Sequence, residues 1–515
     1  MKRLGLPLAV ALSIALTACN PSPEPIERQF GPSPDLPEPR RGVLPNMTIA
    51  DPTEWGDRQP VVPDGFEIRA IATDLGIPRQ TLVLPNGDIL VAEGRGGNAP
   101  SLKPKDVIAG VIKAQGNTSV PSGDRLTLLR DADGDGEYEL QTVFAADLNA
   151  PYGLALVGSD LFVANQDAVV RFDYQPGMTE ASGPPEEFTK LPSEINHHWT
   201  KAMTASADGR FLYVGIGSNS NITERGMTAE ANRAEVWEID TETGMHRPYA
   251  TGLRNPTALA IQPGTGQLWA VVNERDEFGP DLTPDYLTSV QEGGFYGWPW
   301  AYWGQNVDVR VKPENPEKVA ESITPDYALG SHVAALGLDF SSAVMGPEFS
   351  DGVFIGQHGS WNRADPVGYN VIFVPFSNGE PAGDPIEFVG GFRDDDGTFG
   401  RPVGVTVDPR GALIVAEDLS NTIWRVSRIG GASAEEMQAA AGTTMVGMAN
   451  PASEYCVSQG GELEITSDDT GNQSGMCILP DGTVIEEWEL FRRDNPASEQ
   501  PATPEEPGEA EDSDG

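Results

Sequence analysis

The stretch RNPTALAIQPGTGQLWAVVNE, residues 254–274, holds two short apolar segments joined by a glycine-rich turn. The first segment is opened by a proline, and the second ends on polar residues. Short apolar segments bounded by turn residues predict two antiparallel strands of one sheet. The fold depends on how often this unit recurs, because a single hairpin cannot bury a core.

Turns carrying Gly or Asp and followed by a β-rich run occur six times in the chain, at uneven spacings of roughly 50 to 85 residues. They lie at residues 84–93, 157–174, 206–218, 264–274, 349–359 and 408–426. Long helical patterns are missing before about residue 433. Repeats of this size, one four-stranded sheet each, predict an all-β six-bladed β-propeller. The alternative is an irregular pair of β-sandwiches.

A shorter apolar strand precedes each copy, at residues 76–84, 149–156, 198–205, 254–261, 332–340 and 400–407. Aligning these strands on Pro78, Pro151, Thr200, Pro256, Ala334 and Pro402 defines a common register. Two residues earlier stand Gly76, Asn149, His198, Arg254, His332 and Gly400, and one residue earlier stand Ile77, Ala150, Trp199, Asn255, Val333 and Arg401. Innermost strands of a propeller start beside its central channel, so these positions should converge on the axis.

The chain has 77 acidic and 34 basic residues and a net charge of −43, which argues against binding to nucleic acid or to anionic membrane surfaces. Basic side chains that converge in such a protein predict an anion site. We expect His198, Arg254, Asn255, His332 and Arg401 around one end of the channel, with Lys201 nearby. This set suits a polyanionic ligand with a base beside it.

The adjacent pair His197 and His198 is a poor metal site, because neighbours on an extended chain point to opposite faces. Only His198 is in the axial register. We therefore expect His197 to lie in the preceding loop, outside the pocket.

Four segments carry a family resemblance: HHWTKAMTASADGRFLYVGIGSNSN (197–221), TGLRNPTALAIQPGTGQLWAVVNE (251–274), EGGFYGWPWAYWG (292–304) and QHGSWNR (357–363). They resemble the glucose/sorbosone dehydrogenase family, exported six-bladed propellers that oxidise sugars with pyrroloquinoline quinone (PQQ) and calcium. The resemblance covers roughly residues 60–428. HVAALGLDF (332–340) and HGSWNR bring it nearest to the sorbosone-dehydrogenase-like branch.

The resemblance implies a role for His198, ten residues before Asp208, as the general base that takes the sugar hydroxyl proton while hydride passes to the quinone. It implies cofactor contacts from Arg254, Asn255 and Arg401, to which we add Lys201, His332, His358 and Arg363.

The chain departs from the family's glucose oxidisers at three places. Val403 replaces a second arginine, Ala150-Pro151-Tyr152 replaces Gln-Asn-Gly, and Gln357, His358 and Arg363 stand where a lysine is expected. A sorbosone-like aldehyde or another aldose is therefore expected as the substrate rather than glucose.

Two calcium sites are expected. By the resemblance, the loop 271–281 supplies Asn273, Glu274 and Asp276 as oxygen donors at the quinone. The segment DADGDGEYELQT, 131–142, begins like a calcium loop with Asp131, Asp133 and Asp135, but Thr142 stands where a bidentate glutamate is required. Solvated loop acids and a plain Asp-Gly turn are the alternatives.

The ends of the chain are expected to lie outside the propeller. Residues 1–19 read as a lipoprotein signal peptide whose LTAC ends on the lipidation site Cys19, or as an ordinary secretory peptide with an incidental cysteine. We expect a disordered tether at 20–59, the propeller at 60–428, a linker at 429–448 and a disordered acidic tail at 494–515. Residues 449–493 resemble the DUF333 domain, with a disulfide between Cys456 and Cys477.

The combined prediction is an exported lipoprotein, periplasmic or at the cell surface, held to the membrane through lipid alone. It is expected to act as a PQQ- and calcium-dependent sugar dehydrogenase. The sequence lacks the haem motif C-x-x-C-H, so electrons should leave to a separate carrier. A non-catalytic propeller that binds a glycan or a protein is one alternative. A calcium-dependent lactonase is the other, although its axis would call for Asn, Asp and Glu instead of Arg and His.

Overall fold

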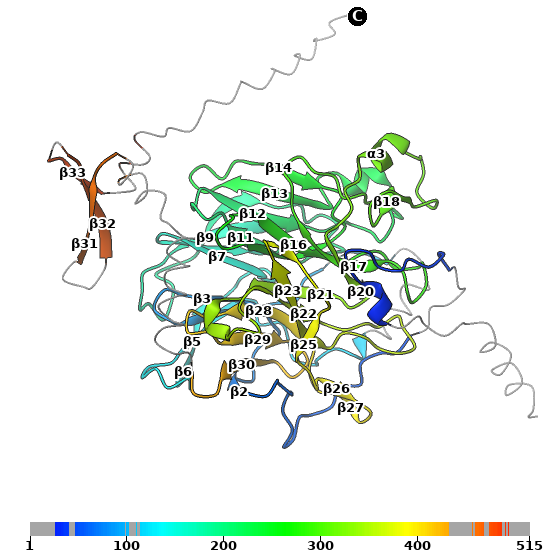
Figure 1. The fold of residues 1–515 in the computed structure, drawn as a ribbon, viewed down its shortest axis with the longest axis horizontal. Helices are drawn as coiled ribbons and strands as arrows, with labels where there is room; N and C mark the ends of the chain where they lie inside the picture. Colours follow the sequence, from blue (N-terminus) through cyan, green and yellow to red (C-terminus); the bar gives the residue numbers. More distant parts are fainter. Residues whose placement is uncertain are drawn as a thin grey trace, which may run out of the picture. The chain divides into compact units, whose positions relative to one another are not determined.

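The computed structural model describes residues 26–40, 47–97, 99–101, 110 and 114–431 of the main body, and residues 456, 459–467, 473–480, 482–486, 490 and 493 near the C-terminus (Figure 1). The chain divides into two compact units, residues 1–447 and 448–515. The predicted signal peptide with Cys19, most of the linker 429–448 and the tail 494–515 lie outside the described residues.

The first unit contains six antiparallel sheets in which strands follow one another in chain order. The first three are β3–β6 (Pro78–Val83, Ile89–Glu93, Arg125–Arg130, Leu140–Ala145), β7–β10 (Gly153–Val157, Asp160–Ala164, Ala168–Asp173, Glu186–Lys190) and β11–β14 (Met203–Ala205, Phe211–Ile216, Glu235–Asp240, His246–Thr251). The fourth is β15, β16, β17 and β20 (Pro256–Ile261, Leu268–Val272, Pro284–Ser289, Tyr327–Ser331), and the fifth is β21, β22, β23 and β25 (Ala335–Phe340, Gly352–Gln357, Asn370–Ser377, Ile386–Val389). The sixth is β28, β29 and β30 (Pro402–Val407, Leu413–Glu417, Thr422–Arg428), completed by β2 (Phe66–Ala72).

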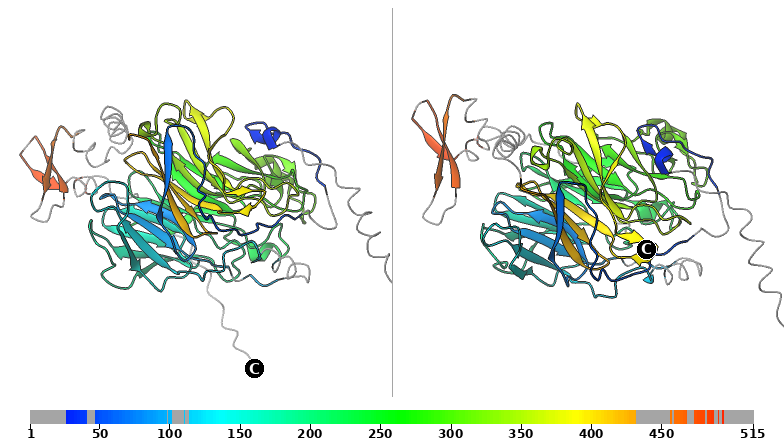
Figure 2. Two further views of the ribbon diagram at one scale, coloured as in Figure 1. Left: turned by 90° about the horizontal axis from the view of Figure 1, so that it is seen from below. Right: turned by 60° about the horizontal axis from the view of Figure 1, so that its bottom comes forward.

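The first strands of the six sheets form a closed ring, in which β3 contacts β7, β7 contacts β11, and so on to β28, which contacts β3. Figure 2 shows the sheets arranged around this ring. The N-terminal strand β2 pairs with β30 from Phe66 opposite Arg428 to Ala72 opposite Ile423, so the two ends of the propeller are joined in one blade. The predicted six-bladed β-propeller is confirmed, and every predicted inner strand overlaps the observed one.

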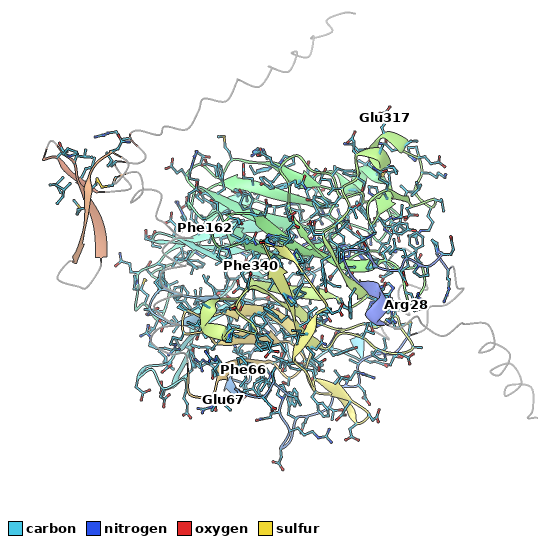
Figure 3. The ribbon with its side chains drawn as sticks, in the orientation of Figure 1. Arg28, Phe66, Glu67, Phe162, Glu317 and Phe340 are labelled. Carbon is cyan, nitrogen blue, oxygen red and sulfur yellow. A yellow bond between two sulfur atoms is a disulfide. The ribbon has the colours of Figure 1, made fainter. Side chains whose placement is uncertain are left out.

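The core lies between neighbouring blades. Trp269 and Leu287 of the fourth blade, for example, pack with Leu338, Ile355 and Phe376 of the fifth. Because both faces of each sheet are covered in this way, the second strands are fully buried: β4, β16, β22 and β29 have no exposed residue. Figure 3 labels Phe162 and Phe340 within such layers and Glu67 and Glu317 at the periphery.

Two short additions lie outside the ring. The insertion between β17 and β20 contains β18 (Ala301–Tyr302), β19 (Asn306–Val307) and the helix α3 (Pro316–Glu321). The hairpin of β26 (Arg393–Asp394) and β27 (Gly397–Thr398) precedes β28.

The segment expected to be a disordered tether instead lies on the propeller wherever it is described. After the short helix η2 (Ile26–Gln29), strand β1 (Phe30–Gly31) adds to the edge of the fourth blade beside β20. Further on, Pro52 bridges to Thr398 and Val61 to Gly390. Prolines are tolerated at a sheet edge, and apolar side chains such as Trp55 pack against the core of the propeller.

In the second unit, β31 (Glu462–Ser467), β32 (Gln473–Ile478) and β33 (Val484–Glu486) form a three-stranded antiparallel sheet. Cys456 and Cys477 form the predicted disulfide, with their Cα atoms 5.7 Å apart. Within the described residues, no helix is both long enough and apolar enough to span a bilayer.

Candidate active site

The candidate site lies at the end of the propeller where inner strands begin and second strands end. The backbone there is strained: Ile77, Ala150, His332 and Ala334, all just before inner strands, have φ angles of 69°, 47°, 66° and 56°. Such values are unusual for residues with a side chain, above all for a β-branched isoleucine. Strain of this kind persists where surrounding contacts hold it, and it concentrates at functional sites.

Buried carboxylates hold these strained starts in place. Glu93 at the end of β4 accepts from the main-chain N–H of Gly76, and Glu417 at the end of β29 accepts from that of Arg401. Asp285 in β17 accepts from the N–H groups of Glu274 and Ala334, so it ties two loops of the site together. Desolvation by burial raises the pKa of Asp285 and that of Glu417 to about 7.

His198 has a defined tautomer. Its Nδ1 lies 2.8 Å from the main-chain oxygen of Ser218 and 3.0 Å from the Ser218 hydroxyl, which itself donates to the carbonyl of Ser220. A carbonyl only accepts, so Nδ1 carries the proton and Nε2 offers a lone pair. Burial, with Arg254 and His197 nearby, holds the pKa of His198 well below 6.5. His198 is therefore a neutral imidazole with its Nε2 available.

The neighbouring His197 is exposed, whereas His198 is partly buried. Their rings meet edge to face with centroids 4.7 Å apart. The two rings therefore pack on the same side and do not point to opposite faces as expected, although only His197 is exposed.

Arg254 is buried, and most of its donors are engaged by the protein. Nη1 donates to the carbonyls of Asn273 and Glu274, Nε to the carbonyl of Asn221, and Nη2 to the Asn221 side chain. A guanidinium has five N–H groups, so Arg254 keeps one for a ligand. Its charge is balanced by no carboxylate within 4 Å among the described residues, and its first role is to fix the loops around 221 and 273.

Asn255, also predicted at the site, is 6% exposed, and its Oδ1 is buried with no donor among the described residues. A Cβ added to Gly217 would lie 2.3 Å from this oxygen and 2.5 Å from Cβ of His198. Gly217 is thus required for the close approach of Asn255 and His198.

His332 is engaged on both ring nitrogens. Nε2 donates to the carbonyl of Gly279 at 2.9 Å, and Nδ1 lies 3.1 Å from Nδ2 of Asn362, which also donates to Asp276. Burial lowers the pKa of His332. Because neither nitrogen is open, His332 positions loops and is a weaker candidate base than His198.

Two predicted cofactor contacts are enclosed within the protein. Lys201 is fully buried, and its Nζ donates to Asn196 and to the carbonyl of Trp199. Arg363 is 2% exposed and donates to Pro280 and Asp365 carbonyls, with Asp281 at 3.5 Å. In this conformation both side chains stabilise loops and neither faces an open channel.

Arg401 donates to the main-chain oxygens of His358 and Gly359. His358 Nε2 lies 2.8 Å from Asp418, which also pairs with Arg79 at 2.7 Å. Burial and the nearby Arg401 lower the pKa of His358 to about 4. Burial alone would raise the pKa of Asp418, but His358, Arg79 and Arg401 hold it below its usual range. Arg401 and His358, both predicted, thus lie together with Arg79, which the register argument did not single out.

The floor of the channel is closed by Tyr152. It is fully buried, and its hydroxyl lies 3.2 Å from the main-chain oxygens of Thr257 and Leu336, which belong to the inner segments of the fourth and fifth blades. Trp199 stands edge-on against Tyr152 with centroids 5.7 Å apart, and the guanidinium of Arg79 lies 5.3 Å from its ring centre. Tyr152, from the second blade, therefore reaches across the axis to the fourth and fifth blades.

The oxygens of the predicted quinone-side calcium loop are only partly free. The carbonyls of Asn273 and Glu274 accept from Arg254, and Oε2 of Glu274 pairs with Arg275 at 3.3 Å. Oδ1 of Asn273 and Oε1 of Glu274 are buried without a donor among the described residues. The donor set is all oxygen, as a hard cation requires, but Arg254 already supplies positive charge to it.

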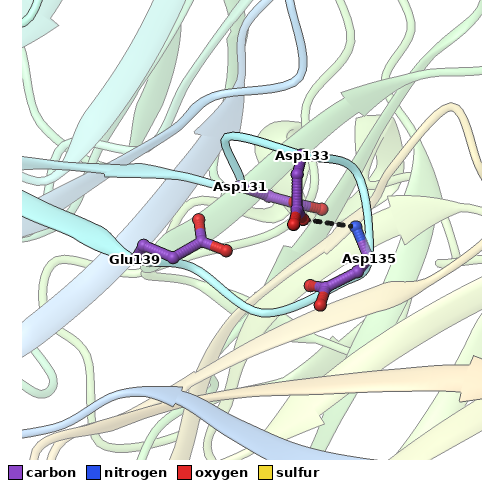
Figure 4. Close-up of side chains that lie close together, drawn as sticks. All are labelled: Asp131, Asp133, Asp135 and Glu139. Atoms are coloured by element: carbon purple, nitrogen blue, oxygen red, sulfur yellow. Dashed lines mark hydrogen bonds between the residues drawn. The ribbon is translucent and has the colours of Figure 1, made fainter.

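The second predicted calcium loop does bring its carboxylates together. Oxygens of Asp131, Asp133, Asp135 and Glu139 lie within 4.8 Å of one another (Figure 4). The sequence pattern missed Glu139, since only position 12 of the loop was weighed. Asp131 also pairs with Arg410 at 2.9 Å.

The residues that sequence reasoning missed come from loops after second strands, except Arg79, which lies in the inner strand β3. Ser218 fixes the His198 tautomer, Asn362 joins His332 to Asp276, and Arg79 with Asp418 borders Arg401. Of these, only Arg79 could have been found from the sequence, because it directly follows Pro78 in the aligned register.

Comparison with known proteins assigns the family. Residues 60–284 and 314–429 match the family model described as TrAA12-like, and these ranges take in strands of all six blades. The chain belongs to the TrAA12-like family. Residues 447–494 match the model of DUF333, a domain of unknown function.

Solved structures agree with this TrAA12-like assignment at the level of fold. A Trichoderma reesei enzyme of carbohydrate-active family AA12 superposes with a TM-score of 0.59 at 20% identity, covering 75% of this chain and 100% of the other. The PQQ domain of pyranose dehydrogenase from Coprinopsis cinerea superposes with a TM-score of 0.58 at 19% identity, covering 72% and 97%.

Among sequence relatives, an uncharacterised protein of Borreliella burgdorferi is 28% identical over 244 residues, 46% of this chain and 63% of the relative. A PQQ-dependent sugar dehydrogenase of Hypocrea jecorina is 21% identical over 420 residues, 71% of this chain and 88% of the relative. The C-terminal unit is similar to the uncharacterised YoaF of Escherichia coli, 51% identical over 55 residues, 11% of this chain and 64% of the relative. The chain thus spans less than two thirds of the Borreliella and YoaF relatives. The resemblance to quinone-dependent sugar dehydrogenases is confirmed.

Proposed function

We propose that this chain is a PQQ-dependent dehydrogenase that oxidises an aldose or a sorbosone-like sugar aldehyde, with His198 as its general base. The observation that carries the proposal is a neutral His198 beside the guanidiniums at the end of the channel, with an Nε2 that has no hydrogen-bond partner among the described residues. The named activities of sugar-oxidising relatives support it.

The pocket suits a polycarboxylate such as PQQ. Arg254 and Arg401 are held by neutral carbonyl oxygens, and neither forms an ion pair with a carboxylate within 4 Å among the described residues. A buried charge without a counter-charge is costly unless a ligand supplies one. Asn255 presents a buried oxygen that lacks a donor, which a ligand N–H would satisfy.

When bound, PQQ would supply the two-electron acceptor. The chain itself would supply the group that takes up the proton. Nε2 of His198 would accept the proton of the hydroxyl that becomes a carbonyl, and for an aldehyde that hydroxyl belongs to its hydrate. The Nδ1–H bond to the Ser218 carbonyl would stabilise the imidazolium that forms. The floor residue Tyr152 would keep bulk water from entering through the far end.

Calcium is proposed at two places. Asn273, Glu274 and Asp276 would hold it beside the quinone, and Asp131, Asp133, Asp135 and Glu139 would hold it in the first blade. Export through the signal segment and lipidation of Cys19 are also proposals. A Cys19→Ala chain that still partitions into the membrane fraction would contradict the lipid anchor.

The direct test of the substrate is a screen. The purified full-length chain is loaded with PQQ and calcium and mixed with aldoses, sorbosone and simple aldehydes, and reduction of a dye acceptor is followed. Turnover of a sugar aldehyde or of an aldose other than glucose, in preference to glucose, is expected. Binding of PQQ without turnover of any of these compounds would favour a binding function for the propeller.

A further inference from the structure

Three arginines from the first and last blades lie close enough to one carboxylate, that of Asp418, for their charges to interact with it. Arg79, at the start of β3, pairs with Asp418 at 2.7 Å and donates to the carbonyl of Gly94. Arg95 follows in the loop after β4, and its charge interacts with those of Arg79 and Asp418. Burial lowers the pKa of Arg401, which lies just before β28, and the charges of Asp418 and Arg79 also act on this pKa. Strands β3 and β28 contact each other where the ring closes, so two blades build one cluster.

The cluster has excess positive charge. Three guanidiniums face one carboxylate, and His358, which donates to Asp418, is neutral because its pKa is lowered to about 4. Burial and then the nearby Arg79 lower the pKa of Arg95, as expected where like charges are held close. The chain as a whole carries a net charge of −43, so a cluster of three cationic side chains is unexpected unless an anion binds to it.

Several donors of the cluster remain open. In the part of the chain that the structure describes, Nη2 of Arg79, Nη1 of Arg401 and the whole guanidinium of the exposed Arg95 have no hydrogen-bond acceptor. None of them is a buried unsatisfied atom, so they reach solvent. Arg254, by contrast, donates four of its N–H groups to the loops around it. The open guanidiniums of the site are therefore on the Arg79 side.

We propose that Arg79, Arg95 and Arg401 form the anion site that takes carboxylate groups of the quinone cofactor, with Arg254 acting mainly as a loop brace. This assignment rests on the proposed function. It adds two residues of the first blade, Arg79 and Arg95, to the expected cofactor contacts. Guanidiniums suit the task because they bind carboxylates through paired N–H groups.

The test measures binding alone. PQQ is titrated into the full-length chain with calcium present and followed by its absorbance, for wild type and for Arg95→Gln, which removes an exposed and unpaired guanidinium. We expect Arg95→Gln to weaken PQQ binding about tenfold or more, the usual cost of a lost charge-assisted hydrogen bond. Arg210→Gln, an exposed arginine in the β11–β12 turn at the other end of the blade, is the matched control and should bind as wild type.

A second ligand separates carboxylate recognition from general damage. The trimethyl ester of PQQ lacks the negative charges, so Arg95→Gln should change its affinity little. Arg79→Lys keeps a positive charge beside Asp418 while removing the planar fork, and it should weaken PQQ but not the ester. Equal affinity of wild type and both variants for PQQ, or equal losses for PQQ and the ester, would overturn this assignment alone. Failure of the wild-type chain to bind PQQ would refute the proposed function and this inference with it.

Discussion

Nδ1 of His198 lies 2.8 Å from the main-chain oxygen of Ser218, a contact between the loop before β11 and the loop after β12. Because that oxygen can only accept, the contact determines which nitrogen of the imidazole is basic. His198 therefore has one basic nitrogen, Nε2, and the contact holds that nitrogen in a defined orientation.

Replacement of His198 by Asn should lower kcat by the ~10²–10⁴ expected for a lost general base. PQQ affinity should stay near the wild-type value, since the imidazole contributes no charge to the anion site. Steady-state rates and PQQ titrations on the same preparations separate the two effects. An unchanged kcat would move the base elsewhere, with His358 as the next candidate because its Nδ1 has no hydrogen-bond partner among the described residues.

The pH dependence of activity should follow the lowered pKa of His198. A base must be unprotonated, so kcat/KM falls only when pH drops below the folded-state pKa, which lies well below 6.5. Activity at pH 6.5 should therefore be close to its plateau. A half-maximal rate at or above pH 6.5 would contradict a desolvated His198.

Tyr152→Phe should destabilise the propeller by about 1–3 kcal/mol, because the carbonyls of Thr257 and Leu336 lose a buried donor. Urea denaturation measures this. Tyr286→Phe is the matched control: Tyr286 is 1% exposed, and its hydroxyl has no partner among the described residues, so its loss should cost little. Equal effects of the two substitutions would mean that the Tyr152 hydroxyl forms no stabilising hydrogen bond to these carbonyls.

Calcium should raise the thermal midpoint of the full-length chain, and a chelator should reverse the rise. Ligand at 100 times Kd stabilises the folded state by about 2.7 kcal/mol. Asp133→Asn should reduce the shift if the first-blade loop is the site. Asp57→Asn changes an exposed acid that has no hydrogen bond or ion pair among the described residues, and it should leave the shift intact. A shift that survives in Asp133→Asn would point to the loop of Asn273 and Asp276 instead.

The sequence predicted the inner strands well, because proline-led apolar segments repeat in a fixed register. It could not predict contacts between loops that are far apart in the chain. Arg79 meets Asp418 across 339 residues, and Asn362 meets Asp276 across 86. Nor could composition show that Arg254 would donate hydrogen bonds to carbonyl oxygens of the loop that was expected to hold calcium.

The N-terminal segment was predicted wrongly for a related reason. Its proline content is typical of a flexible tether, but Phe30 and Gly31 find an unpaired strand edge at β20. Pairing with a distant edge leaves no local signal in the residues that pair.

The central claim is tested most directly by anaerobic reduction of bound PQQ in a single turnover. The full-length chain with stoichiometric PQQ and calcium is mixed with a sugar aldehyde or aldose, without dye, and the quinone spectrum is followed. The account predicts rapid reduction with one product per quinone in wild type, and reduction slowed by ~10²–10⁴ in His198→Asn. PQQ that binds but stays oxidised with every sugar offered, or that is reduced equally fast in both chains, would contradict the account.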